Sequence, residues 1–205
     1  MDPNSSPQMS ESTPALVLEN AHTGEVLRLV RYAESEGDRL ELEGMIPQGR
    51  ASMAVHLHRA EDLALSVRLG TLSILLNDRR GSLEEGKSLT IPRGSAYRLW
   101  NEGPGPVHYT ADVEGVVDMD RYLEAVFQVI NASPKDRPSL TYLAKVMLDH
   151  RRTQAVQLLS RPVQSPLFWG VVLAGTVSGR YRGSDWPGAP ASLHGAPQGA
   201  EPPAS

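Results

Sequence analysis

The chain has 205 residues and a net charge of −4, and its acidic and basic residues are mixed along the sequence without the basic stripe that nucleic-acid binding requires. It contains no cysteine, so disulfides, thiolate zinc sites, iron–sulfur clusters and cysteine nucleophiles are excluded. Its longest apolar run, Leu167 to Val177, is shorter than the roughly 20 residues that a membrane-spanning helix needs. We therefore expect a cytoplasmic globular protein with no nucleic-acid partner and no membrane association.

Both ends of the chain have the composition of segments that do not fold. Residues 1–15 are rich in Ser and Pro and lack the basic start and apolar stretch of a secretory signal, so we expect a disordered leader. Residues 183–205 are dominated by Gly, Pro, Ala and Ser, so we expect a disordered tail. Between these ends we expect a β-barrel over residues 16–117 and a helical extension over residues 118–182.

The first of these two parts consists of short apolar and β-branched runs separated by Gly, Pro and Asn. This spacing of turn residues is typical of an all-β sandwich or barrel. The runs that we expect to form strands are Val26–Tyr32, Arg39–Ile46, Met53–His58, Leu63–Leu69, Thr71–Leu76, Ser88–Ile91, Tyr97–Asn101 and Val107–Val113.

After Asp118 the apolar residues recur at intervals of three and four, which predicts amphipathic helices. The first begins at Asp118 or Asp120 as its N-cap, and its apolar face is Tyr122, Leu123, Val126, Phe127 and Ile130. A second follows Pro138 and Ser139. A third, over residues 165–178, is apolar almost all the way round, so we expect it to pack on the barrel, on the other helices or on a second subunit.

Two motifs lie within the predicted barrel. In the first, Gly49 leads to His56-Leu57-His58 and, further on, to Gly70. The second contains Gly86, Pro92, Gly94 and Asn101. In this order and at this separation they resemble the two motifs of the cupin superfamily. With the segments around Glu19–Glu25 and Val163–Phe168, residues 16–182 resemble bacterial single-domain cupins that carry a helical carboxy-terminal extension. The resemblance implies a mainly β protein with a cupin-type double-stranded β-helix, or jelly-roll barrel, and a C-terminal α-helical extension.

The metal-ligand pattern of the family is incomplete in this chain. His56 and His58 are two residues apart, so on a strand both imidazoles face the barrel interior and can converge on one ion. The resemblance implies two further ligands, a Glu and a His, but Leu63 and Tyr97 occupy their positions. Asp62 does not replace the missing carboxylate, because the alternation from Leu63 to Leu69 puts Asp62 on the outward face.

These departures leave two interpretations of the candidate pocket residues His56, His58, Leu63 and Tyr97. His56 and His58 either are hydrogen-bonded interior histidines or bind a divalent ion such as Fe, Mn, Ni or Zn. Tyr97 either fills the volume of a lost metal cluster or offers its hydroxyl to a ligand. Trp100 is interpreted as barrel packing, and the remaining histidines as surface residues: His22, His108, His150 and His194.

Three functions are compatible with this pattern. The first is a metal-independent protein that binds a small molecule inside the barrel, with or without an isomerase-like or cyclase-like activity and without a cofactor. The second is a metal-dependent oxygenase or isomerase that uses His56 and His58. The third is a non-catalytic interaction protein whose helices form the partner surface. Most cupins dimerise through strand edges, so the resemblance also implies a homodimer, with Val26–Tyr32 and Arg39–Ile46 as the candidate edges.

Overall fold

The protein is described here by a computed structural model that covers residues 11–12, 14–33, 37–134, 138–156, 161–182 and 186–188. Most of the predicted leader and tail, together with His194, lies outside the described residues. Eleven strands precede the first helix: β1 (Glu11–Ser12), β2 (Leu16–Glu19), β3 (Val26–Ala33), β4 (Arg39–Ile46), β5 (His56–His58), β6 (Leu63–Leu69), β7 (Thr71–Leu76), β8 (Arg79–Glu84), β9 (Ser88–Ile91), β10 (Tyr97–Trp100) and β11 (Val107–Val113). They are followed by α1 (Met119–Asn131), α2 (Leu140–Asp149), β12 (Gln154–Val156) and α3 (Arg161–Val177).

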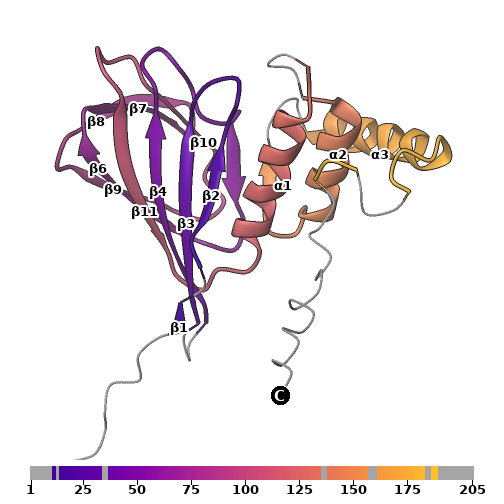
Figure 1. The fold of residues 1–205 in the computed structure, drawn as a ribbon, viewed down its shortest axis with the longest axis horizontal. Helices are drawn as coiled ribbons and strands as arrows, with labels where there is room; N and C mark the ends of the chain where they lie inside the picture. The colour runs from indigo at the N-terminus through magenta and orange to yellow at the C-terminus, as the bar shows by residue number, and fades with distance from the viewer. Residues whose placement is uncertain are drawn as a thin grey trace, which may run out of the picture.

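The strands form two antiparallel sheets with the strand order of a jelly roll (Figure 1). One sheet contains the sequence β4-β11-β6-β9, and the other contains β5-β10-β7-β8. Strands β1, β2 and β3 extend the first sheet beyond β4, and β12 from the helical part extends the second sheet beyond β5. The eight strands β4 to β11 are therefore shared equally between two sheets, with β7 and β8 forming a hairpin within one of them, as in a double-stranded β-helix, and the predicted fold class is confirmed.

The core lies between the two sheets and is set by alternation along the strands. On β6, Leu63, Leu65 and Val67 are buried, while Ala64 and Arg68 are exposed. Strand β11 pairs with β6 and alternates in the same way. A side chain of this size contributes about 1.5–3 kcal/mol when it is fully buried. The inward face of each strand therefore fixes its register, because a shift by one residue would turn the apolar set outward.

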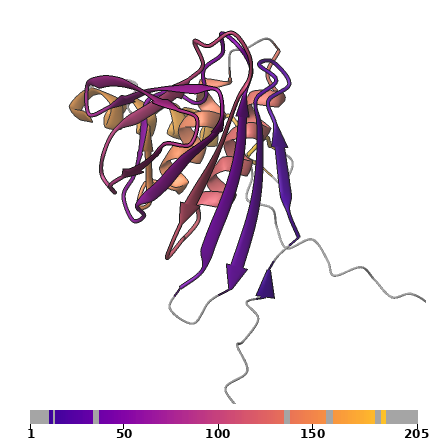
Figure 2. The same ribbon diagram turned by 90° about the vertical axis from the view of Figure 1, so that its left-hand side faces the viewer.

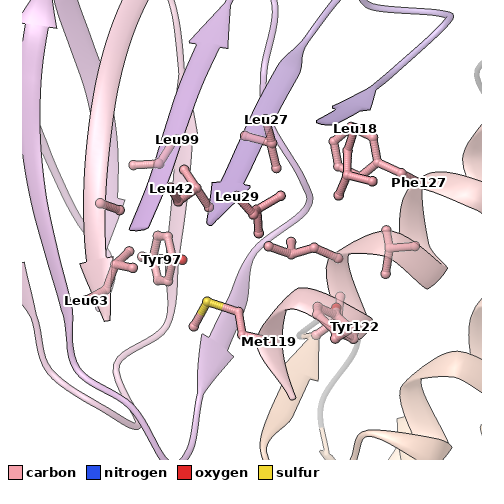
Figure 3. Packing of buried hydrophobic residues seen from close by; sticks show 14 of the residues in the cluster. Leu18, Leu27, Leu29, Leu42, Leu63, Tyr97, Leu99, Met119, Tyr122 and Phe127 are labelled. Atoms are coloured by element: carbon pink, nitrogen blue, oxygen red, sulfur yellow. The ribbon is translucent and has the colours of Figure 1, made fainter. Parts of the chain in front are cut away.

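Helix α1 covers the edge of this core with the apolar face that its periodicity predicts. Tyr122, Leu123, Val126 and Phe127 are buried. Figure 3 shows Phe127 beside Leu18 of β2, and Met119 at the start of α1 pointing toward the interior of the β-helix. In Figure 1, α1 stands between the strands and the other two helices. The helical extension therefore closes one side of the core through the buried face of α1.

Helix α3 packs through one face only. Phe168 and Val172 are buried, whereas Trp169, Leu173 and Val177 are exposed. The expectation that α3 packs on the preceding helices holds for the buried face, which contacts α2. The structure differs from the sequence prediction just after α3, because Trp186 is buried within the predicted tail and stacks on Tyr142. No helix among the described residues is long and apolar enough to cross a membrane.

The strand order corrects the predicted dimer edges. Strands β3 and β4, which contain Val26–Tyr32 and Arg39–Ile46, both have partners on two sides (Figure 2). The edges of the two sheets, within the described residues, are formed by β1 and β2, β9, β12 and β8. Alternation identifies a strand but not its neighbours. The sequence prediction also missed four strands entirely: β1, which lies in the predicted leader, β2, β8 and β12. The homodimer itself stays a prediction.

Candidate functional site

A small cavity lies between the two sheets where α1 meets the strands. Its volume is about 40 Å³, and its wall includes all four candidate residues, His56, His58, Leu63 and Tyr97. The remaining lining residues are Leu27, Leu42, Ser52, Met53, Leu99, Tyr109, Ala111, Met119 and Leu123. Figure 3 shows Leu63 and Tyr97 on the strands, and Met119 of α1 pointing toward the same part of the interior. None of these described lining residues is an aspartate, glutamate, lysine or arginine.

The two sequence motifs meet at this cavity because β5 and β10 are paired neighbours. Tyr97 of β10 lies directly opposite His56 of β5. The turn at Gly94 in the second motif is also hydrogen-bonded to the first motif, because the N–H of Gly94 donates to the carbonyl of His58 at 2.6 Å. Gly94 has a φ of 79°, a conformation that a residue with a Cβ rarely adopts. Asn101 ends the motif in a structural role, because its amide donates to the carbonyls of Ile46 and Gly105.

Both ring nitrogens of His58 have partners. Nδ1 lies 2.5 Å from Oε1 of Gln154, which can only accept, so Nδ1 carries the proton. Nε2 then accepts from the hydroxyl of Tyr97 at 2.7 Å. Gln154 belongs to β12, which pairs with β5. The helical extension therefore contributes directly to the site, and His58 is held in one tautomer between two strands.

His56 has one free ring nitrogen. Its Nδ1 lies 2.9 Å from the carbonyl of Ala54 and donates to it. Nε2 is therefore an acceptor, and no described residue hydrogen-bonds to it. The His56 ring is 4.4 Å from the Tyr97 ring between centroids, and it stands nearly perpendicular to the His58 ring. The cavity thus offers one unused imidazole acceptor.

Burial keeps the three polar residues uncharged. Burial lowers the pKa of His56, despite its hydrogen bond to Ala54. Burial, followed by the neighbouring His56, lowers the pKa of His58 to about 3. Burial likewise raises the pKa of Tyr97 well above its ordinary value, so its proton stays on the hydroxyl. At neutral pH the three side chains form a neutral hydrogen-bonding group in an apolar enclosure.

The divalent metal ion that the sequence resemblance implies does not fit these residues. A metal needs the free lone pair of each imidazole, and Nε2 of His58 is used by Tyr97. The two remaining ligand positions hold the hydrocarbon of Leu63 and the protonated phenol of Tyr97, both buried. Among the described residues no group of three or more His, Cys, Asp or Glu side chains is arranged to hold an ion.

The neighbouring carboxylates do not complete a ligand set. Asp62 is exposed, as its position in the alternation predicts, and accepts from the N–H of Arg93 at 2.7 Å. Glu61 is buried, but its Oε1 accepts from the N–H of Val117 at 3.2 Å, and Glu61 does not line the cavity.

Sequence reasoning missed four polar residues at or beside the cavity: Glu25, Ser52, Tyr109 and Gln154. Ser52 precedes β5, and Tyr109 lies on β11. Glu25 ends the turn before β3 and is only 1% exposed. It has the same parity as the buried Leu27 and Leu29, so the alternation of β3 places a carboxyl group on the inward face. No comparable signal existed for Gln154, whose strand has three residues.

Two other expectations need correction. His150 is not a surface histidine, because it is partly buried and its Nδ1 lies 2.6 Å from Oδ2 of Asp118. His22 is also partly buried, with Nε2 at 3.2 Å from the carbonyl of Ile130. Trp100 lies outside the cavity and is half-buried beneath the guanidinium of Arg80, at 5.1 Å.

Comparison with known proteins gives structural neighbours but no sequence relative. No family model and no curated protein matches the sequence. The cupin domain of Cnp3 from Schizosaccharomyces pombe is 16% identical, with a TM-score of 0.39 over 44% of this chain and 65% of that one. A predicted oxalate decarboxylase from Thermotoga maritima is 17% identical, with a TM-score of 0.40 over 50% and 92%. KdgF from a Halomonas species is 15% identical, with a TM-score of 0.42 over 49% and 89%.

The fold follows from the chain itself, because its jelly-roll strand order places the two sequence motifs on the paired strands β5 and β10 around one cavity. It is a double-stranded β-helix, the fold that the sequence resemblance implies, and a helical extension supplies part of the site.

A conservative change at Tyr97 tests the hydrogen-bond chain. Tyr97→Phe removes the donor and leaves Nε2 of His58 buried without a partner, so we expect a loss of about 1–3 kcal/mol in the free energy of unfolding, measured with urea. The control is Tyr122→Phe, since Tyr122 is equally buried but its hydroxyl has no partner. That change is expected to be neutral or stabilising. Equal losses in both variants would contradict the hydrogen-bond chain.

Proposed function

We propose that this protein binds a small, uncharged molecule between the sheets of its double-stranded β-helix without a metal ion. The observation that carries this proposal is the hydrogen bond from Tyr97 to Nε2 of His58, which uses the lone pair that a metal would need. The replacement of a carboxylate by Leu63 supports the same reading. In this proposal, His56 and His58 serve as hydrogen-bonding residues of a pocket.

The lining of the cavity defines the class of ligand. No described lining residue carries a permanent charge, so nothing there would compensate a phosphate or carboxylate group. Nε2 of His56 accepts a hydrogen bond, and the other polar contacts available are the hydroxyls of Ser52 and Tyr109. The walls are aliphatic side chains and the thioethers of Met53 and Met119. These features favour a neutral, mainly apolar molecule with one or two polar atoms.

The volume of the cavity limits the size of that molecule. One water needs roughly 10–15 Å³ on this measure, so a cavity of about 40 Å³ accepts about three or four non-hydrogen atoms. A larger ligand requires Met53, Met119 or Leu123 to move. Met119 and Leu123 belong to α1, so the helical extension sets how far the pocket opens. An isomerase-like or cyclase-like reaction on such a neutral molecule is compatible with this pocket, and we propose binding as the activity to test first.

The direct test is methyl NMR on protein labelled at Leu and Met, titrated with small neutral ketones, alcohols and amides in the presence of a chelator. We expect neutral fragments to shift the methyls of Leu63, Leu99 and Met119. The exposed Leu173, on α3, provides an internal control that should not move. Acetate and inorganic phosphate should have little effect. Cavity methyls that respond to divalent metal ions but to no neutral fragment would contradict the proposal and favour the metal-dependent alternative.

A further inference from the structure

Strand β8 is a free edge of the five-stranded sheet. It pairs with β7 through all six of its residues without a bulge, and no described strand pairs with its other side. It contains no proline, and only Leu83 in it is buried. In Figure 1, β8 lies on the side of the molecule away from the three helices. A regular, uncovered edge of this kind is a template for pairing with another strand.

The other sheet edges offer less backbone for such pairing. Within the described part of the chain they are strands of two to four residues: β1, β2, β9 and β12. Strand β9 also ends directly before Pro92, which has no N–H to donate. Strand β8 is therefore the edge that offers a second chain the most backbone hydrogen bonds.

The turn before β8 decides which of its backbone groups point away from the sheet. Asn77 and Asp78 connect β7 to β8, and both have a positive φ, 47° and 66°, as a two-residue type I′ turn requires. In a hairpin of this type the flanking residues, here Leu76 and Arg79, form a hydrogen-bonded pair, and such pairs alternate along the ladder. The backbone groups that point into the free edge therefore belong to every second residue: Arg80, Ser82 and Glu84.

The charges along β8 make a second copy of this strand its matching partner. Arg80 lies near one end and Glu84 at the other, with Ser82 midway between them. In a two-fold symmetric antiparallel pair, each residue lies opposite the residue that is equally far from the axis on the other chain. With the axis at Ser82, Arg80 of each chain lies directly opposite Glu84 of the other, and opposite charges at such positions attract.

The neighbouring registers lack this match. An axis at Arg80 or at Glu84 puts two like charges directly opposite each other, which is destabilising. An axis at either of the residues beside Ser82 also brings like charges together: Asp78 and Glu84 for Gly81, or Arg79 and Lys87 for Leu83. The sequence of the strand thus favours a single antiparallel register with a second copy of itself.

We propose that two copies of this chain pair antiparallel through β8, with the two-fold axis at Ser82. The pairing joins the five-stranded sheets of both protomers into one continuous sheet. Arg80 keeps the contacts within its own chain, to Glu102 and to the ring of Trp100, that hold its guanidinium on the outer face of the sheet. The cavity between the sheets takes no part in this contact, so the inference is independent of the proposed function.

The size of this contact sets its expected strength. One six-residue strand on each side buries less than the roughly 800 Å² per partner of a standard stable complex, so we expect a reversible dimer with a Kd in the micromolar range. The measurement is sedimentation equilibrium of the full chain from about 5 µM to about 500 µM. A chain that stays monomeric over the whole range would overturn the proposal.

Charge reversals test the register. Glu84→Arg puts two arginines opposite each other and Arg80→Glu puts two glutamates opposite each other, so each variant alone should dimerise about tenfold more weakly than the wild type, or less. An equimolar mixture of the two variants restores both opposite-charge pairs, so dimers should return as heterodimers. The matched control is Arg98→Glu, at an exposed position of β10 in the same sheet, which should dimerise as the wild type does.

Ser82→Pro tests the backbone bonds. It removes an N–H that points into the free edge and spares the ladder with β7, so the fold should persist by circular dichroism while the dimer is lost. If this variant does not fold, the mixture of charge variants decides alone. A dimer that survives both charge reversals, or single variants whose mixture regains no dimer, would overturn the proposal. A dimer lost in Trp169→Ser but kept in Glu84→Arg would equally overturn it, because the contact would then lie on the exposed face of α3.

Discussion

Leu63→Glu combined with Tyr97→His should create a divalent-metal site between the two sheets. The Tyr97 replacement releases Nε2 of His58 from its hydrogen bond and adds a third imidazole. The Leu63 replacement places a carboxylate on the same inward face. The site then has three nitrogen ligands and one oxygen ligand, a set that Zn(II), Ni(II), Mn(II) and Fe(II) accept.

The expected effect is large enough to measure without ambiguity. A ligand at a hundredfold excess over its Kd stabilises the folded state by about 2.7 kcal/mol, so metal should raise the Tm of the double variant clearly. Nδ1 of His58 keeps its bond to Gln154, which orients the new ligand. Leu63→Glu alone is the control, because it adds the buried carboxylate while the Tyr97 hydroxyl still donates to Nε2 of His58. A double variant that folds but gains no stability from any of these metals would show that the four positions do not converge.

The second large effect is a pH dependence of stability due to Glu25. Its pKa is raised from 4.5 to about 7 in the folded protein, so the folded state holds the proton more tightly than the unfolded state. The contribution of Glu25 is therefore most favourable below about pH 4.5 and is lost as the pH rises to about 7 and above. At about 1.36 kcal/mol per unit of pKa, the loss is of the order of 3 kcal/mol.

His58 has the opposite dependence, because its pKa falls from 6.5 to about 3 and its contribution grows as the pH rises through that range. The difference between the wild type and Glu25→Gln isolates Glu25. We expect Glu25→Gln to gain stability relative to the wild type as the pH rises above about 5, measured by urea unfolding. Glu43→Gln is the matched surface control and should follow the wild type. A difference that stays constant from about pH 5 to about pH 8 would contradict the buried, protonated Glu25.

Much of the fold could be predicted from the sequence because the inward positions follow the strand alternation. The pattern of Leu63, Leu65 and Val67 places Leu63 inward and Asp62 outward, and both positions agree with the structure. The spacing of His56 and His58 places both on one face in the same way. In these cases one local period determines which way a side chain points.

The parts that could not be predicted depend on contacts distant in the sequence. Gln154 reaches His58 only because β12 adds to the free edge of β5, and the two residues are 96 positions apart. The strands at the sheet edges could not be predicted for the same reason, because strand order depends on contacts throughout the jelly roll. Glu25 is different, because its two-residue spacing from Leu27 already indicates an inward position in the sequence. It was missed because no known motif includes it.

The measurement that tests the metal-independent pocket most directly is the ¹⁵N NMR spectrum of the His56 and His58 rings before and after one equivalent of Zn(II). We predict two neutral rings, each protonated at Nδ1, with Nε2 of His58 accepting a hydrogen bond, and no change in either ring when zinc is added. Coordinated Nε2 atoms on both rings at one equivalent of zinc, lost in His56→Ala, would contradict the account.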